Sequence, residues 1–272
     1  MRAMPVLRRI VTALAAGALA TAALAPAAQA DATIASGGPL TAITIGSDLA
    51  CQVSHAGDSA FELFPPTASP GDCGTFLAAG GALYAPNFAG HGPTATTNGL
   101  PAGSYTPFTP VSQSPVTGSG TSADPYTVVT QASAGNFSLT ETDRYVTGDE
   151  SYRTDVQVNG SGSFVLYRAG DCYLQNSDSG FGFTEAAGSG TGVGCRAVNP
   201  ADPSQPGDRI EEWAPLTAGA SFLEARYNEV WAAIATQAPF GNECRACATA
   251  VDNGAGLSWS GSGTATFSHL TA

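Results

Sequence analysis

Apolar and polar residues alternate in several short stretches near the middle of the chain. One stretch covers residues 137–145, and a second covers residues 152–158, where Tyr, Thr, Val and Val occupy every second position. Successive side chains of a strand point to opposite faces of a sheet, so this alternation is typical of strands with one buried face. Turn residues separate these stretches from each other and from a third at 163–168. The pattern predicts three consecutive antiparallel strands that form a meander.

Elsewhere the apolar residues come in short runs that Gly, Pro, Asn or Ser interrupt, which favours strands over helices. Near the N-terminus, residues 33–53 contain the β-branched run 43–45. The further strands that we predict are 208–213, 221–226, 227–235 and a last hairpin of 256–259 with 264–269. For residues 223–234 a short helix is the alternative to these strands, because few of the residues are β-branched. The whole pattern predicts an all-β fold, a single large antiparallel β-sandwich with long loops over residues 31–272.

Two segments differ from this regular pattern. Residues 175–208 are rich in turn residues and contain Pro200, Pro203 and Pro206, which cannot lie in a central strand, so we expect an excursion from the scaffold. Residues 74–123 contain no charged side chain. The aromatic residues spaced through them are Phe76, Tyr84, Phe88, Tyr105 and Phe108. We interpret this segment as neutral strands and long loops, with a weakly hydrated contact surface as the alternative.

The N-terminal segment predicts export from the cell. Arg2, Arg8 and Arg9 precede an apolar run over residues 10–24, and residues 28–30 read Ala-Gln-Ala, the small-x-small pattern that signal peptidase cleaves. We therefore expect residues 1–30 to be a cleaved signal peptide and the mature protein to be secreted and extracellular. The pair Arg8-Arg9 leaves twin-arginine export open as an alternative to general secretion. No second apolar run is long enough to span a membrane.

The charge balance excludes two classes of partner. The chain has 22 acidic residues and ten basic ones, all of them arginine, and three of these arginines lie in the signal segment. A protein this acidic has no basic surface for nucleic acid or for an anionic membrane. We expect a monomer whose surface is solvated mainly by Ser, Thr, Asn and Gln.

Six cysteines, an even number, fit a disulfide framework in an oxidising compartment. Proximity in the sequence favours three local pairs among the fifteen connectivities that six cysteines allow. These pairs are Cys51–Cys73, Cys172–Cys195 and Cys244–Cys247. A redox site or a zinc site at Cys244-x-x-Cys247 is the alternative for the last pair.

Nucleophilic catalysis has no support in the sequence. The Gly/Ser turns at 118–121 and 188–191 lack the strand-to-helix setting that an exposed nucleophile needs. His55, His91 and His269 have no neighbouring histidine or carboxylate at metal-ligand spacing, and we expect them at the surface or in loops. We therefore assign no catalytic residue, and no cofactor or metal beyond a calcium alternative at residues 167–180.

Acidic and aromatic residues are the candidates for ligand contact. Asp171, Asp178, Glu211 and Glu229 would supply the carboxylates of a carbohydrate-active enzyme if two of them face each other across a sugar. Asp171 and Asp178, together with Asn176, also offer oxygen ligands of the kind that calcium prefers, although turns that brace a disulfide loop explain the same residues.

Flat aromatic rings beside polar groups are typical of sugar sites. For a Trp on a strand, the alternative is a buried position in the core. The candidate ligand-binding residues are Asp171, Tyr173, Asp178, Trp213, Tyr227, Glu229 and Trp231.

The chain resembles a module of secreted actinobacterial proteins in four segments. They are ETDRYVTGDESYRTD at 141–155, LYRAGDC at 166–172, LSW at 257–259 and ATFSHL at 265–270. The resemblance covers residues 35–270 and implies a β-sandwich of the mutarotase-like supersandwich kind. That group includes sugar epimerases and non-catalytic domains of polysaccharide-active enzymes. Mutarotases use a His and a Glu at the sugar ring, and no histidine of this chain aligns with that role, so the resemblance implies no catalytic residue.

These observations favour a secreted, non-catalytic β-sandwich that binds extracellular polymer or cell-surface material, with carbohydrate as the preferred ligand. A carbohydrate-active enzyme with paired carboxylates is the first alternative. A secreted protein-interaction or inhibitor module, for which a rigid protruding disulfide loop would argue, is the second.

Overall fold

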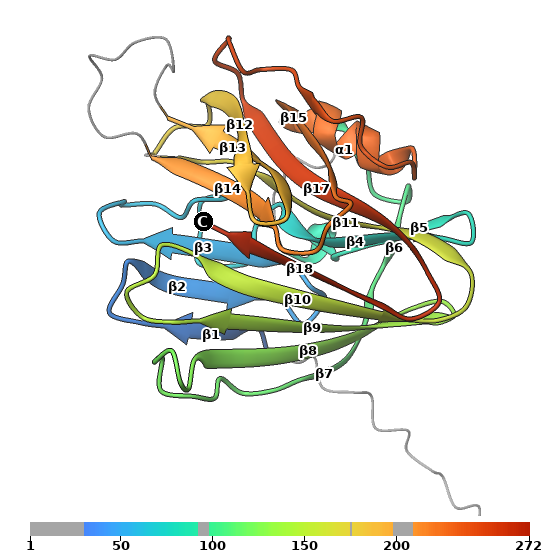
Figure 1. Ribbon diagram of the computed structural model, residues 1–272, viewed down its shortest axis with the longest axis horizontal. Coiled ribbons are helices and arrows are strands. Elements are labelled where there is room, and N and C mark those ends of the chain that lie inside the picture. The colour runs from blue at the N-terminus through green and yellow to red at the C-terminus, as the bar shows by residue number, and fades with distance from the viewer. Residues whose placement is uncertain (1–29, 92–97, 175, 198–208) are drawn as a thin grey trace, which may run out of the picture.

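The computed structural model describes residues 30–91, 98–174, 176–197 and 209–272, which form three β-sheets (Figure 1). The first sheet has three strands, in the order β1 (Ala32–Ala35), β2 (Leu40–Ile45) and β3 (Cys51–His55). The second has eight, in the order β12 (Phe181–Ala187), β13 (Gly190–Arg196), β14 (Ile210–Pro215), β18 (Ala265–Thr271), β10 (Tyr152–Asn159), β9 (Phe137–Tyr145), β8 (Tyr126–Ala134) and β7 (Thr109–Gln113). The third has seven, in the order β16 (Glu243–Cys244), β15 (Ser221–Arg226), β17 (Asn253–Ser262), β11 (Ser163–Asp171), β4 (Cys73–Ala79), β5 (Ala82–Ala85) and β6 (Thr106–Pro107).

The eight-stranded and seven-stranded sheets pack face to face, which confirms the predicted all-β sandwich. Leu139 and Val156 of the eight-stranded sheet share one buried cluster with Leu77, Leu166 and Leu257 of the seven-stranded sheet. Every second residue of β9 and β10 is buried, which confirms that the alternation in the sequence comes from strands with one buried face.

The three-stranded sheet covers one end of the eight-stranded sheet. Ile43 belongs to a second buried cluster with Val128, Tyr145 and Tyr152, which lie near the ends of β8, β9 and β10. The hydroxyl of Tyr145 accepts a hydrogen bond from the amide of Leu40 at 3.2 Å. This small sheet therefore extends the layer that packs on the inner face of the eight strands.

Residues 227–235 form helix α1 (Tyr227–Ala235), so the strand predicted there is wrong and the helical alternative applies. Val230, Trp231 and Ile234 share one side of the helix and are buried with Phe76 against the outer face of the seven-stranded sheet. The helix has nine residues, and within the described ranges no helix combines the length and apolar character needed to cross a membrane.

The uncharged segment 74–123 supplies β4 to β7 and the short 3-10 helix η1 (Phe88–Gly90). Phe76, Phe88 and Phe108 are fully buried in the two main apolar clusters. These rings stabilise the core, which favours the strand-and-loop interpretation over a contact surface made of the same aromatic residues.

Two predicted hairpins are instead crossings between the layers. Strand β10 pairs with β9 and β18, whereas β11 pairs with β4 and β17, so the predicted meander is wrong at its third strand. The last two strands separate in the same way, because β17 and β18 join different sheets. At each crossing a glycine with positive φ turns the chain, Gly162 at 102° and Gly263 at 65°. The amide of Gly263 donates to the carbonyl of Gly162 at 3.1 Å, so the two crossings support each other.

The expected excursion at 175–208 is also wrong in part. Strands β12 and β13 lie within it and form one edge of the eight-stranded sheet. The turn residues around Gly188 close this hairpin, where φ is 54°. Pro200, Pro203 and Pro206 lie outside the described residues.

The three disulfides are the pairs that sequence proximity favours. Cys51–Cys73 joins the start of β3 to the start of β4, and Cys172–Cys195 joins the residue after β11 to β13. The first bond connects the small sheet to the seven-stranded sheet, and the second connects the two large sheets. Cys244–Cys247 closes a short loop, and the bond between its sulfurs leaves no thiolate to bind zinc.

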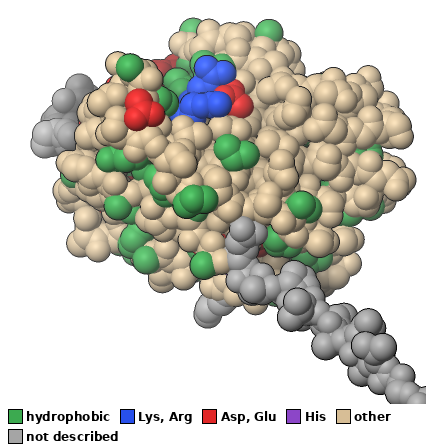
Figure 2. Space-filling model, turned by 90° about the horizontal axis from the view of Figure 1, so that it is seen from below, with side chains coloured by type: hydrophobic (Ala, Val, Ile, Leu, Met, Phe, Trp, Pro, Cys, Tyr) green, Lys and Arg blue, Asp and Glu red, His purple; other side chains and the backbone are tan. Residues whose placement is uncertain are grey.

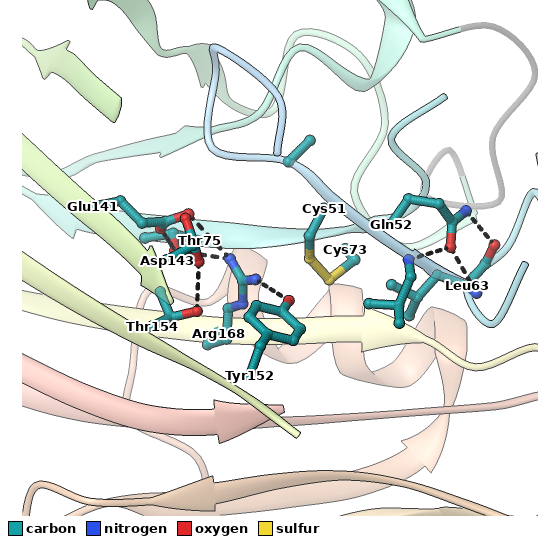
Figure 3. The surroundings of a disulfide bond; sticks show 12 residues. Cys51, Gln52, Leu63, Cys73, Thr75, Glu141, Asp143, Tyr152, Thr154 and Arg168 are labelled. Carbon is teal, nitrogen blue, oxygen red and sulfur yellow. Dashed lines mark hydrogen bonds and ion pairs between the residues drawn. A yellow bond between two sulfur atoms is a disulfide. The ribbon is translucent and has the colours of Figure 1, made fainter. Parts of the chain in front are cut away.

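A belt of buried polar side chains separates two of the three apolar clusters, the one that contains Leu139 and the one that contains Tyr145. Figure 3 shows several members of this belt. Asp143 of β9 is paired with Thr154 of β10, and Thr154 is paired with His269 of β18. All three residues are buried. His269 is therefore an interior residue, and its predicted place at the surface or in a loop is wrong. Burial, and then the charge of Arg168, lower the pKa of His269 well below its ordinary value, so the ring is neutral.

Arg168 of β11 crosses from the seven-stranded sheet into this belt. Its Nη1 lies 3.5 Å from Oε1 of Glu141 and donates to Oγ1 of Thr75 at 3.3 Å. Its Nη2 donates to the hydroxyl of Tyr152 at 3.0 Å. One cation faces two acids here. Burial, and then the charge of Glu141, raise the pKa of Asp143 to about 8, so that Asp143 carries a proton at neutral pH.

Replacing Arg168 by Met should lower the free energy of unfolding by about 3–5 kcal/mol, because Glu141 would remain buried without its cation. Urea denaturation of the two proteins measures this difference. The matched control is Arg153→Met, since Arg153 is half exposed and pairs with Asp155 at 2.7 Å. That exposed pair should contribute at most about 1 kcal/mol. Equal losses in the two variants would contradict a special role for Arg168.

Candidate functional site

A cleft of about 380 Å³ opens at the end of the sandwich, where β3, β14 and β18 contribute residues. Its apolar lining residues are Leu40, Val53, Leu174, Ile210 and Ala272. Its polar lining residues are His55, Glu62, Glu150, Arg209, Glu211 and Thr271. A concave site with apolar walls and a few convergent polar groups is the usual form of a small-molecule site.

Glu62 reaches the cleft from the loop between β3 and β4. Its amide donates to the carbonyl of Val53 at 3.0 Å, and its carbonyl accepts from the amide of Tyr173 at 2.7 Å, so the backbone is held on both sides. Burial, and then the neighbouring Asp58, raise the pKa of Glu62 to about 8. Arg209, 3.6 Å from its Oε1, only partly offsets these effects. The Glu62 carboxyl is therefore mostly protonated at neutral pH.

Glu211 enters from β14, where it is paired with Cys195 of β13. The Cys172–Cys195 bond thus places Glu211 next to the end of β11. Glu211 is 4% exposed, and neither of its carboxyl oxygens has a hydrogen-bond partner among the described residues. Burial, and then the charge of Glu62, raise the pKa of Glu211 well above its ordinary value. The cleft therefore contains two carboxyls that are held in the neutral form.

One ion pair and one histidine–carboxylate contact frame this pair of acids. Nη2 of Arg209 lies 2.9 Å from Oδ2 of Asp58, and Nε2 of His55 lies 3.0 Å from Oε2 of Glu150. Glu150 is largely exposed, whereas Asp58 and Arg209 are more deeply set. The cleft thus has buried acids with raised pKa values inside and the exposed carboxylate of Glu150 toward solvent.

The residues that the sequence indicates as ligand-binding do not form one site. Asp171 and Asp178 lie together with Asp252, with one carboxylate oxygen of each within 4.8 Å of the others. Glu229 lies elsewhere, on α1, where it pairs with Arg245 at 3.1 Å. Of the four proposed catalytic carboxylates, Glu211 alone lines the cleft.

The two tryptophans among those candidates are core residues. Trp213 and Trp231 are both 0% exposed, so neither can cover a sugar at the surface. Trp213 belongs to the cluster between the large sheets and Trp231 to the cluster under α1. Tyr173 and Tyr227 are half-buried: Tyr173 lies against Phe64, with ring centroids 6.5 Å apart, and the hydroxyl of Tyr227 accepts from Asn98 at 2.6 Å.

The sequence does not single out Glu62, Glu150, Arg209 or Asp252. These residues lie in four separate segments, and only the folded topology brings them near Glu211 or Asp171. His55 also has its partner, Glu150, 95 positions away in the chain. No spacing rule detects a pair of this kind.

Comparison with protein-family models and with curated proteins finds no match to this chain. The resemblance to a mutarotase-like actinobacterial module therefore stays a prediction.

Glu62→Gln should stabilise the protein increasingly as the pH rises. The folded pKa of about 8 is above the ordinary value of 4.5, so the wild type loses stability as the pH rises from about 4.5 to about 8. Gln does not titrate and lacks this loss. At pH 8 the variant should unfold with a free energy at least about 1.4 kcal/mol higher than the wild type, the equivalent of a pKa change of one. Denaturation at pH 4 and pH 8 tests this, and a difference that is the same at both values would contradict it.

Proposed function

We propose that this is a secreted, non-catalytic protein that binds carbohydrate of an extracellular polymer or a cell surface in the cleft around Glu62 and Glu211. Three disulfides in a chain of this size are typical of an oxidising, extracellular environment. The N-terminal signal segment supports the same location.

The chemistry of the cleft is the observation that carries this proposal. A sugar presents apolar C–H surfaces and hydroxyl groups that both donate and accept hydrogen bonds. Leu174 and Ile210 offer apolar walls. Protonated Glu62 and Glu211 can each donate one hydrogen bond and accept others, which complements a hydroxyl group. Arg209 adds donors at the same place.

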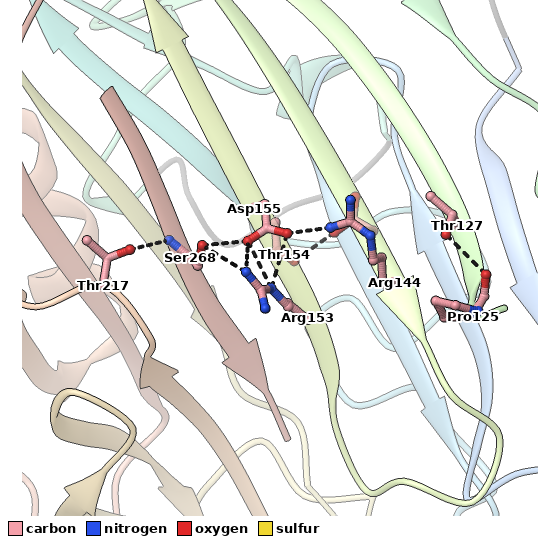
Figure 4. A network of polar contacts seen from close by, with 9 residues as sticks. Pro125, Thr127, Arg144, Arg153, Thr154, Asp155, Thr217 and Ser268 are labelled. Atoms are coloured by element: carbon pink, nitrogen blue, oxygen red, sulfur yellow. Dashed lines mark hydrogen bonds and ion pairs between the residues drawn. The ribbon is translucent and has the colours of Figure 1, made fainter. Parts of the chain in front are cut away.

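The surface chemistry agrees with a neutral partner. Figure 2 shows a face covered mainly by backbone and uncharged side chains, with scattered hydrophobic side chains and a small cluster of arginine and acidic side chains. On the outer face of the eight-stranded sheet, Asp155 binds both Arg144 and Arg153 and accepts a hydrogen bond from Ser268 (Figure 4). Both guanidinium groups thus share one carboxylate, which reduces the positive charge that this face offers to nucleic acid.

Catalysis on carbohydrate is the second candidate. A glycoside hydrolase needs an acid that carries a proton and a second carboxylate across the sugar. Glu62, with a pKa of about 8, and Glu150 line the same cleft and would take these roles. The pair differs from the carboxylates that the sequence suggests.

The inhibitor alternative has less support. The Cys244–Cys247 loop lies against β15 rather than projecting as a rigid arm. Its Ala246 is buried, and the amide of Ala246 donates to Glu224 at 2.9 Å.

Sedimentation with insoluble polysaccharides and bacterial cell walls tests the proposal. The wild type should be retained on one polymer and released by soluble fragments of that polymer. Ile210→Arg should reduce retention at least about tenfold, because it places a long charged side chain in the cleft and removes an apolar contact, a loss of about 1.4 kcal/mol or more. The matched control is Val111→Arg, since Ile210 and Val111 are both exposed apolar residues on strands and Val111 lies outside the cleft.

Each outcome separates the candidates. Unchanged retention of Ile210→Arg would exclude the cleft as the binding site, and no retention of the wild type on any polymer would overturn the carbohydrate proposal. Release of reducing ends by the wild type, abolished in Glu62→Gln, would establish the enzyme instead.

A further inference from the structure

Three aspartates meet beside the cleft, where the end of β11 lies next to the start of β17. Asp171 is the last residue of β11, Asp178 lies in the loop that follows, and Asp252 immediately precedes β17. One carboxylate oxygen from each lies within 4.8 Å of the other two. The amide of Cys172 donates to the carbonyl of Asn253 at 3.0 Å, which holds two of the three segments together.

Asp171 is buried in this group without a partner. It is 1% exposed, and neither of its carboxylate oxygens has a hydrogen-bond partner in the described part of the chain. One oxygen of Asp178 and one of Asp252 are also buried and unpartnered. Burying ionised carboxylates without partners is costly, so buried charges are normally paired or coordinate a metal.

The surrounding charges do not supply the missing cation. The charges that act on the buried Asp171 carboxyl are those of four acids, Asp72, Asp252, Asp178 and Glu211. The cation Arg226 acts electrostatically on Asp252, but it is not among the groups that act on Asp171. The group is therefore rich in oxygen ligands and short of positive charge.

We propose that Asp171, Asp178 and Asp252 bind a calcium ion. Calcium takes oxygen ligands at about 2.3–2.6 Å, so two ligand oxygens on opposite sides of one ion lie about 4.6–5.2 Å apart, which the observed spacing fits. The three ligands are hard oxygens without histidine or thiolate, a set that suits calcium rather than zinc or copper. Asp178 and Asp252 are half-buried, so an ion can enter from solvent and complete its coordination with water.

The site differs in part from the calcium alternative that the sequence suggests. Asp171 and Asp178 belong to both, but the third carboxylate is Asp252, 81 positions after Asp171 in the chain. Asn176 is exposed, and its Oδ1 accepts a hydrogen bond from Ser59 at 2.7 Å. A bound ion would link β11, the loop after it and the segment before β17, and thereby reinforce the Cys172–Cys195 bond. This proposal does not rest on carbohydrate binding.

Thermal unfolding of the disulfide-bonded protein tests the site with calcium chloride as the probe. Sites of extracellular modules bind calcium with a Kd of about 10⁻⁴–10⁻³ M, so about 10 mM calcium should raise Tm by about 3–10 °C relative to a chelator. Sodium chloride at the same ionic strength should give no such rise. Isothermal titration of the wild type with calcium measures Kd directly and does not depend on any variant folding.

Asp178→Asn and Asp252→Asn should each weaken calcium binding at least about tenfold. Both side chains are partly exposed, so the variants should fold. The matched control is Asp124→Asn, an exposed aspartate in the turn before β8, which should respond to calcium like the wild type. The absence of heat and of a Tm rise in the wild type would overturn the proposal, as would an undiminished response in both site variants. No carbohydrate is present, so failure here is distinguishable from failure of the cleft proposal.

Discussion

The buried guanidinium of Arg168 is the constraint to which the rest of the sandwich is adjusted. A charge at this depth needs nearby acids and hydrogen-bond acceptors, and these come from strands of both large sheets: Glu141 of β9, Tyr152 of β10 and Thr75 of β4. The contacts exist in one register alone. A slip of one residue would turn Glu141 and Asp143 to the outer face and leave the arginine unpaired. The belt therefore specifies how the sheets align, while the apolar clusters on either side supply most of the burial.

The same alignment produces the chemistry at the end of the molecule. Arg168 lies three residues before Asp171 on β11, so its anchoring also determines where the end of this strand lies. Cys172 then connects that end to β13, whose neighbour β14 carries Glu211. Acids from β11, β14 and the loops between them are thus brought together by the strand order rather than by any local motif. The functional region is a consequence of how the two sheets are joined.

Alternation in the sequence is sufficient to predict β9 and β10, because each has one buried face that a period of two reveals. Two features cannot be predicted from alternation. Glu141, Asp143 and His269 are polar yet buried, since their partners come from other strands. The crossings at Gly162 and Gly263 look like hairpin turns, because a local sequence specifies a turn but not the sheet that the next strand joins. The cleft is less predictable still: Glu62, Arg209 and Glu211 acquire their neighbours only when distant loops meet. Local disulfides are the exception, since short separations already limit the choice.

A chain with 22 acids, ten arginines and no lysine must find more than one way to bury its carboxyl groups. The structure uses an arginine for Glu141, and it uses protons for Asp143 and Glu62, whose pKa values rise to about 8. Burial and the neighbouring acids raise the pKa of Asp171 well above its ordinary value, so a proton can neutralise this carboxyl, whereas Asp178 and Asp252 reach solvent. A divalent cation would neutralise the three carboxyls together. Because basic residues are scarce, buried carboxyls in this protein are neutralised in different ways: by an arginine in the interior belt, by protons in the belt and the cleft, and by the proposed cation in the aspartate cluster.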